Sequence, residues 1–146
     1  MKKIFCSLLF LLSGLLLTAQ TIENPTFKAR NGSIYNITRI ERTPQCTKVY
    51  IHAIFRPHWW IMEDGDRYLE DAATGKRYAQ TGAEGIQLKE KIVMPDSGTT
   101  DFVLLFEPLP KETETIHLID PNGNESNTYD ISLVPAPKDK QPFRSE

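Results

Sequence analysis

The sequence predicts an all-β fold, an antiparallel immunoglobulin-like β-sandwich of about seven to nine short strands. All 10 prolines and seven of the 8 glycines lie after residue 20, and in that part of the chain no stretch free of both exceeds twelve residues. Long helices are therefore nearly excluded, because proline and glycine break helix interiors. Between these breaks lie runs rich in Ile, Val, Thr, Tyr and Phe, the residues that suit a pleated sheet.

The chain begins with the pattern of a secretory signal peptide, which we assign to residues 1–19. A basic start with Lys2 and Lys3 precedes an apolar run over residues 4–17, and small residues around Ala19 offer a cleavage site. The run is too short to span a membrane as a helix. We therefore expect an exported protein of the periplasm or cell envelope, or an extracellular one, with no membrane span after the signal is removed.

Residues 20–134 form the expected β-sandwich domain, and residues 135–146 form an expected disordered tail. The tail holds three prolines, five charged residues and a single aromatic residue, too little apolar surface to offset its ordering entropy. Signal cleavage would remove Cys6 and leave Cys46 alone, so no internal disulfide is expected. The net charge of −2 is unlike that of a strongly basic nucleic-acid binder, and we expect no nucleic-acid partner.

The first half of the domain contains one clear strand and one hairpin. Residues 21–30 are expected to be a partly extended lead-in. Within residues 48–56 apolar side chains alternate with more polar ones, which is typical of a strand with one buried face. Ala73-Thr74-Gly75 separates residues 67–71 from residues 76–80, which predicts a hairpin with its turn at the glycine.

The second half contains two further strands and two strong turns. Residues 102–106 are almost entirely apolar, so that strand is predicted to be buried on both faces. Residues 128–133 alternate and predict a strand with one wet face. Turns are predicted at residues 95–98 and 120–124, where proline presets φ and glycine or asparagine supplies a positive φ. Two segments stay open between a strand and a turn of helix: residues 86–94 and 111–115.

The densest candidate for a binding site is a block that holds both tryptophans of the chain. With two tyrosines of the following hairpin, its residues are Arg56, His58, Trp59, Trp60, Tyr68 and Tyr78. Neighbouring residues on a strand point to opposite faces, so we expect one tryptophan to fill the core and the other to be exposed. An exposed indole beside tyrosine suits a sugar ring or a proline-rich partner segment. The alternative is that the second tryptophan packs beneath the connection over residues 80–85.

Three further groups contain side chains of the kinds that serve in catalysis or metal binding. The acidic residues 63–66 lack the spacing of a calcium loop and predict a solvated turn. His52, His58 and His117 show no metal-binding spacing. Cys46 lies in a turn without a Cys-x-x-Cys pattern and is expected to be a spectator thiol or an intermolecular one. We therefore expect no catalytic residue, no metal site and no cofactor.

Two stretches resemble a known family. They are residues 50–61 (Tyr-Ile-His-Ala-Ile-Phe-Arg-Pro-His-Trp-Trp-Ile) and residues 85–110, through Ile-Val-Met-Pro-Asp-Ser-Gly to Phe-Val-Leu-Leu-Phe-Glu-Pro-Leu-Pro. Both are similar to a small β-sandwich module of exported proteins of Bacteroidetes-type bacteria, which commonly stands upstream of a thioredoxin-like domain. The resemblance covers about residues 24–134 and implies an exported accessory module. Redox activity is not implied, because the chain has no Cys-x-x-Cys.

The expected function is therefore that of a non-enzymatic exported binding or accessory module, with an envelope protein or a glycan as its partner. A carbohydrate-binding module that uses the exposed tryptophan and tyrosine is the alternative. A small hydrolase or a thiol-linked enzyme is a further alternative function. Such an enzyme would need a pocket that brings histidines, Cys46 and the carboxylates of residues 63–71 within hydrogen-bond reach.

Overall fold

The computed structural model describes residues 19–30, 33–122 and 128–135. Apart from Ala19, the expected signal peptide lies outside the described residues, and so does the expected tail after Pro135. The end of the turn predicted at residues 120–124 is also outside them. The described chain consists of strands, turns and loops without a helix, which confirms the all-β prediction.

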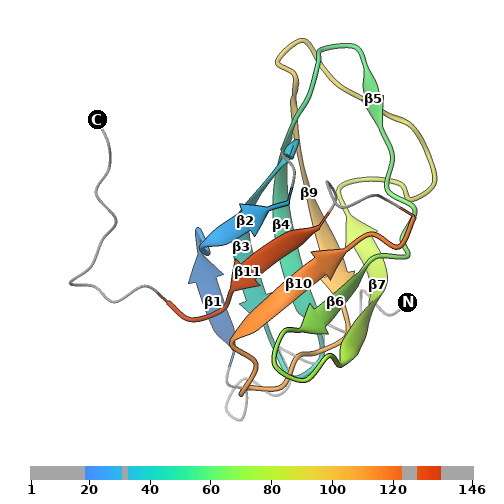
Figure 1. The fold of residues 1–146 in the computed structure, drawn as a ribbon. Coiled ribbons are helices and arrows are strands. Elements are labelled where there is room, and N and C mark those ends of the chain that lie inside the picture. Colours follow the sequence, from blue (N-terminus) through green and yellow to red (C-terminus); the bar gives the residue numbers. More distant parts are fainter. Residues whose placement is uncertain (1–18, 31–32, 123–127, 136–146) are drawn as a thin grey trace, which may run out of the picture.

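Nine strands form one antiparallel sheet, and two more form a separate ribbon (Figure 1). The strand order of the sheet is β1-β3-β4-β9-β7-β6-β10-β11-β2. Its strands are β1 (Gln20–Glu23), β2 (Phe27–Ala29), β3 (Tyr35–Arg42), β4 (Thr47–Ile54), β6 (Tyr68–Asp71), β7 (Arg77–Glu84), β9 (Thr99–Phe106), β10 (Thr115–Ile119) and β11 (Tyr129–Ser132). The ribbon consists of β5 (Trp60–Ile61) and β8 (Ile92–Val93). The described residues thus hold more strands than expected, because several strands are very short.

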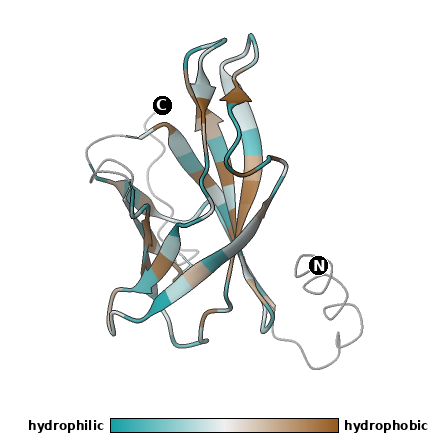
Figure 2. Ribbon diagram, turned by 90° about the vertical axis from the view of Figure 1, so that its right-hand side faces the viewer, coloured by the Kyte–Doolittle hydropathy of each residue, from teal (hydrophilic) through white to brown (hydrophobic). Residues whose placement is uncertain are grey.

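The large sheet curls because β7 belongs to both of its halves. Arg77 to Ala79 pair with β6, and Gln80 to Glu84 pair with β9. The register shifts between Gln80 and Gly82, and such a bulge bends a strand and increases its twist. The two halves therefore face each other (Figure 2). The expected immunoglobulin-like arrangement is not confirmed, since one continuous sheet supplies both layers.

The N-terminal segment supplies both edges of this sheet. β1 pairs with β3 and β2 pairs with β11, at opposite ends of the strand order. In the short link between them, the Asn24 N–H donates to the Thr38 carbonyl at 2.8 Å, and the Ser132 N–H donates to the Thr26 carbonyl at 2.9 Å. The lead-in expected at residues 21–30 is therefore two edge strands, and short edge strands limit pairing with other chains.

The alternation in the sequence identified the inner faces of the long strands correctly. Val49 and Ile51 of β4 are buried while their neighbours are partly exposed. At the end of β9, Leu104 and Leu105 are both buried, so this central strand is covered on both faces there. Bands of hydrophobic and hydrophilic residues alternate along several strands (Figure 2). The core between the two halves includes the fully buried side chains of Ile40, Leu69, Leu104, Phe106, Leu118, Tyr129 and Ile131.

The predicted hairpin is formed by β6 and β7. The Gly75 N–H donates to the Asp71 carbonyl at 2.8 Å, and Gly75 has a φ of 76°, the left-handed conformation that glycine adopts easily. The turn predicted at residues 95–98 also forms, with the Gly98 N–H bonded to the Pro95 carbonyl at 2.9 Å. Of the two segments left open, residues 86–94 contain only the short β8 as a strand, and residues 111–114 form a turn and a short link before β10, which begins at Thr115.

Candidate functional site

The ribbon of β5 and β8 rises beyond the body of the sheet (Figure 1). Trp60 lies opposite Val93, and Ile61 lies opposite Ile92. One loop connects the end of β4 to the start of β5, and a second loop connects the end of β8 to the start of β9. We call residues 54–62 together with residues 89–98 the tip.

Backbone hydrogen bonds join the two loops of the tip. The Phe55 N–H donates to the Gly98 carbonyl at 2.8 Å, the His58 N–H to the Met94 carbonyl at 3.0 Å, and the Met94 N–H to the Trp59 carbonyl at 2.7 Å. His58 has a φ of 66°, a conformation uncommon for residues other than glycine. These bonds hold the loops in one geometry and fix how both tryptophans are presented.

Both tryptophans are about half exposed, with relative accessibilities of 55% for Trp59 and 49% for Trp60. The prediction that one of them fills the core is wrong, and neither packs under residues 80–85, most of which belong to β7. The physical reason is that their short strand pairs only with β8 and stands off the large sheet. Three other large hydrophobic side chains of the tip are exposed as well: Ile54, Met62 and Val93. Among the described residues, Val134 is the only exposed large hydrophobic side chain outside the tip.

Each indole has a cation over its ring. The Arg56 guanidinium carbon lies 4.9 Å from the centroid of Trp59, and the Lys91 ammonium nitrogen lies 4.8 Å from the centroid of Trp60. Such cation–π contacts are worth about 0.5–1 kcal/mol at exposed sites. The rings of Trp59 and Phe55 form an edge-to-face pair, with their centroids 5.9 Å apart. The tip therefore presents indoles and cations together.

The two tyrosines of the predicted binding set lie elsewhere. Tyr68 is on β6, where the Arg77 guanidinium carbon lies 4.6 Å from its ring centroid. Tyr78 is buried on β7, and the Lys76 ammonium lies over its ring. Figure 1 shows these strands in the body of the sheet, away from β5. The structure thus brings Arg56, His58, Trp59 and Trp60 together but not the tyrosines.

A buried ion pair lies at the base of the ribbon. Glu63, two residues after β5, is 2% exposed, and Arg67 is 5% exposed. The Arg67 Nε and Nη2 atoms donate to the two Glu63 carboxylate oxygens at 2.8 and 3.0 Å, a bidentate arrangement. The Tyr35 hydroxyl donates to the Glu63 Oε2 atom at 2.8 Å. The predicted solvated turn is therefore wrong for Glu63, whereas Asp64 is exposed as expected.

The charges in this network are stabilised by one another. Burial alone would lower the pKa of the Arg67 guanidinium, but Glu63, Tyr35 and Asp120 together outweigh burial and raise this pKa. Burial, followed by the nearby Glu63 charge, raises the pKa of the Tyr35 hydroxyl. Arg67 also lies 3.8 Å from the Asp120 carboxylate. At neutral pH the network therefore contains a buried cation, Arg67, and a neutral phenol, Tyr35.

Glu63 also connects this buried network to the ribbon. The Glu63 carbonyl accepts a hydrogen bond from the Lys89 N–H at 2.8 Å, so Glu63 contacts the segment that leads into β8. The Tyr35 ring packs edge-on against Phe102 at 5.6 Å and stacks on Tyr129 at 6.2 Å. The sequence offered one signal of this pair, the four-residue spacing of Glu63 and Arg67, but nothing local pointed to Tyr35.

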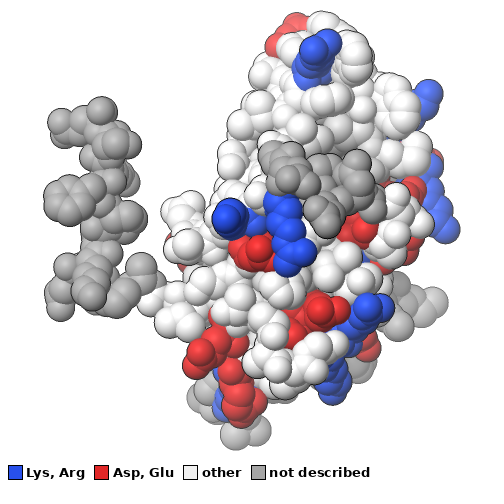
Figure 3. Space-filling view, viewed as in Figure 1, with Lys and Arg blue, Asp and Glu red and all other residues white. Residues whose placement is uncertain are grey.

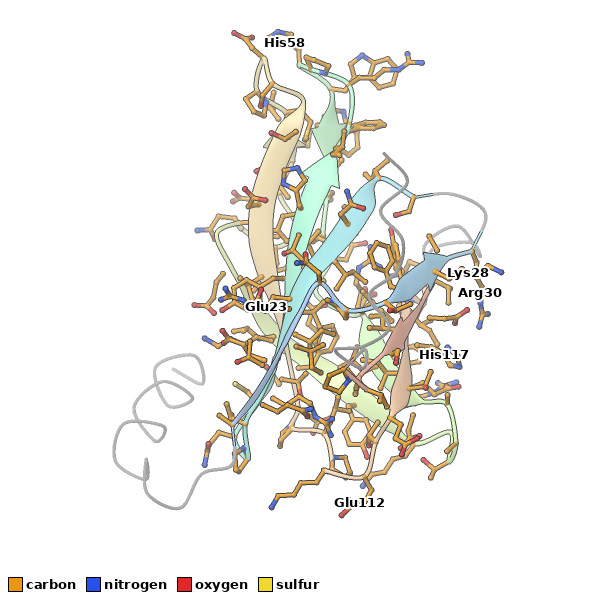
Figure 4. All side chains as sticks on the ribbon, turned by 90° about the vertical axis from the view of Figure 1, so that its left-hand side faces the viewer. Glu23, Lys28, Arg30, His58, Glu112 and His117 are labelled. Carbon is orange, nitrogen blue, oxygen red and sulfur yellow. The ribbon has the colours of Figure 1, made fainter. Side chains whose placement is uncertain are left out.

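The three histidines do not converge, and each has its own carboxylate. Figure 4 shows His58 and His117 in different parts of the molecule. The pairs are His52 with Asp101 at 2.6 Å, His58 with Asp96 at 3.0 Å and His117 with Asp130 at 2.5 Å. Within the described part of the chain, no group of three or more His, Cys, Asp or Glu side chains is placed to hold a metal ion.

Cys46 is buried in the turn before β4. Its N–H donates to the Thr43 Oγ1 atom at 3.1 Å. Cys6 lies outside the described residues, and no disulfide joins two residues that are described. The described residues also include no helix of the length and hydrophobicity needed to cross a membrane.

Breaking the buried ion pair should destabilise the protein strongly. Glu63→Gln leaves the Arg67 cation buried beside a neutral amide, and we expect the free energy of unfolding to fall by about 3–5 kcal/mol. The double variant Glu63→Leu, Arg67→Met removes both charges and should recover most of this loss. Urea denaturation measures both. Glu70→Gln, which breaks the exposed pair with Arg77, is the control and should change little. Equal losses in Glu63→Gln and Glu70→Gln would contradict the assignment.

Gly98 should be essential for the geometry of the tip. It has a φ of 68°, and a Cβ atom there would lie 2.6 Å from the Phe55 carbonyl oxygen. Gly98→Ala should therefore break the Phe55–Gly98 bond and speed hydrogen exchange at the tip amides. Gly75→Ala is a matched control, because Gly75 has a similar φ of 76° but nothing within 4 Å of the added atom. Unchanged exchange at the tip in Gly98→Ala would show that the loops are not coupled in this way.

Comparison of the chain with models of protein families, with curated proteins and with solved structures finds no match.

Proposed function

We propose that the protein is a non-enzymatic binding module of the periplasm or cell envelope that contacts its partner through the tip. The observation that carries this proposal is the half-exposure of both tryptophans on a projecting, hydrogen-bonded tip. Tryptophan and arginine are enriched where binding energy concentrates. An exposed apolar cluster of this kind marks an interaction site more often than an isolated surface residue does.

The export assignment rests on the signal-peptide pattern of residues 1–19. The resemblance of residues 50–61 and 85–110 to modules of exported Bacteroidetes-type proteins supports the same location and an accessory role. Neither a hydrolase nor a thiol-linked enzyme is proposed, because the three histidines and Cys46 lie on separate elements.

A carbohydrate-binding module is the second candidate, and the exposed indoles favour it. Aromatic rings present a flat apolar surface with a π face, which suits the face of a sugar ring. The cations over Trp59 and Trp60 would have to move aside or share the ring with the sugar. An envelope protein is therefore favoured over a glycan as the partner. A change in tryptophan fluorescence emission on addition of a polysaccharide would reverse this preference.

Removing an indole should abolish capture of the partner. When the wild-type protein, Trp59→Ala and Trp60→Ala are used to pull down material from an envelope extract, we expect a partner recovered by the wild type to be lost with either variant. Val134→Ala, which truncates a side chain that is 53% exposed and lies outside the tip, should recover it normally. Recovery of every partner in equal amounts by all four proteins would rule out the tip as the contact surface.

A further inference from the structure

We infer that the tip docks on the surface of a phospholipid bilayer, with its indoles at the level of the headgroups and its cations on the lipid phosphates. This inference rests on the proposed function, because it assigns a partner to the same tip. The argument depends on three features of the tip: where its apolar side chains point, which charges accompany them, and how firmly the loops are held.

The first feature is that apolar side chains leave the outer end of the ribbon in opposite directions. Trp60 and Val93 lie directly opposite each other in the ribbon and so share one face. Trp59 precedes β5, and the hydrogen bond from the Met94 N–H to the Trp59 carbonyl extends the pairing of the ribbon to it. Because neighbouring side chains of an extended chain alternate between faces, we assign Trp59 to the other face, where it contacts Phe55. Val93 is 64% exposed. A protein docked against one face would leave the other indole in water, whereas the boundary of a bilayer surrounds a projecting wedge on every side.

The second feature is the charge of the tip. It carries three cations, Arg56, Lys89 and Lys91, and two carboxylates, Glu90 and Asp96, whereas the whole chain has 17 basic and 19 acidic residues. The Asp96 carboxylate is paired with His58 at 3.0 Å. The tip is thus more positive than the chain as a whole. Figure 3 shows its visible surface as mainly uncharged, with a few charged side chains at its end and side.

This combination matches the chemistry of the membrane interface. Tryptophan is enriched at the headgroup level, where one end of the ring is in an apolar medium and the other is wet. Lysine and arginine place their apolar stems beside it and extend their charges to the phosphates. Arg56 and Lys91 already lie over the two indoles, so each ring and its cation would enter the interface as a unit.

The third feature is the rigidity of the two loops. Three backbone hydrogen bonds join them, and the chain at the base of the ribbon is fixed by the buried Glu63. Little conformational entropy is therefore lost when the tip enters an interface, and preorganisation of this kind increases affinity. The tip is small, so the expected binding is reversible, as for a peripheral protein with a single shallow anchor.

Tryptophan emission provides a direct test, because the only two tryptophans of the chain lie in the tip. Vesicles of phosphatidylcholine, and of phosphatidylcholine with phosphatidylglycerol, are added to the full-length protein after signal removal. We expect the emission to shift to the blue and the protein to sediment with the vesicles, more strongly with the anionic lipid. Lipids brominated near the headgroup should quench the emission more than lipids brominated at the chain ends.

Variants that keep both indoles make the test specific. Val93→Asp places a charge at the exposed centre of the ribbon and should abolish the shift and the sedimentation, whereas Val134→Asp is the matched control outside the tip. Both substitutions are at exposed positions, and circular dichroism checks that each variant is folded. Arg56→Gln and Lys91→Gln should each weaken binding to the anionic vesicles about fivefold, and added salt should reduce the difference between the two kinds of vesicle.

The outcomes separate this inference from the proposed function. No shift and no sedimentation with either vesicle would overturn the membrane assignment, and so would equal binding by Val93→Asp and the wild type. If vesicles have no effect while the emission responds to a polysaccharide, or while a protein is captured only when both indoles are present, the membrane assignment fails and the tip remains a binding surface. If no partner of any kind depends on the tip, both proposals fail.

Discussion

The buried contact between Glu63 and Arg67 is the constraint on which the candidate site depends. A carboxylate and a guanidinium removed from water are tolerated only when their hydrogen bonds are nearly complete, and here Tyr35 supplies the additional donor. Tyr35 begins β3 in the large sheet, while Glu63 lies two residues after β5. The ion pair therefore attaches the ribbon to the body of the protein. Its buried hydrogen bonds are all formed only in one arrangement of the three side chains.

This attachment explains how the domain can present an apolar ribbon outside its core. The body buries its apolar side chains between the two halves of a curled sheet, whose edges are both formed by the N-terminal segment. The ribbon contributes Ile61 to that core and keeps its outer end outside it. Under the proposed function, stability and recognition are separated in space: the body supplies stability, and the tip supplies the contact surface.

Much of the body could be predicted from the sequence, and much of the tip could not. Period-2 alternation identified β4 and β11, and a continuous apolar run identified β9, because strand burial leaves a local pattern. It could not reveal that Trp60 pairs with Val93, more than thirty positions away, and that their ribbon stands off the sheet. The burial of Glu63 was missed for the same reason, since its partner Tyr35 is distant in the sequence. The block of residues 56–60 was identified by composition alone.

We propose that this protein docks on phospholipid bilayers through the tip. Hydrogen–deuterium exchange measured with and without phosphatidylglycerol-containing vesicles tests it most directly, because it reports on every segment of the chain at once. We predict slower exchange in residues 54–62 and 89–98 when vesicles are present, with β6, β10 and β11 unchanged. Protection that appears on those strands instead, or none at the tip, would contradict the account.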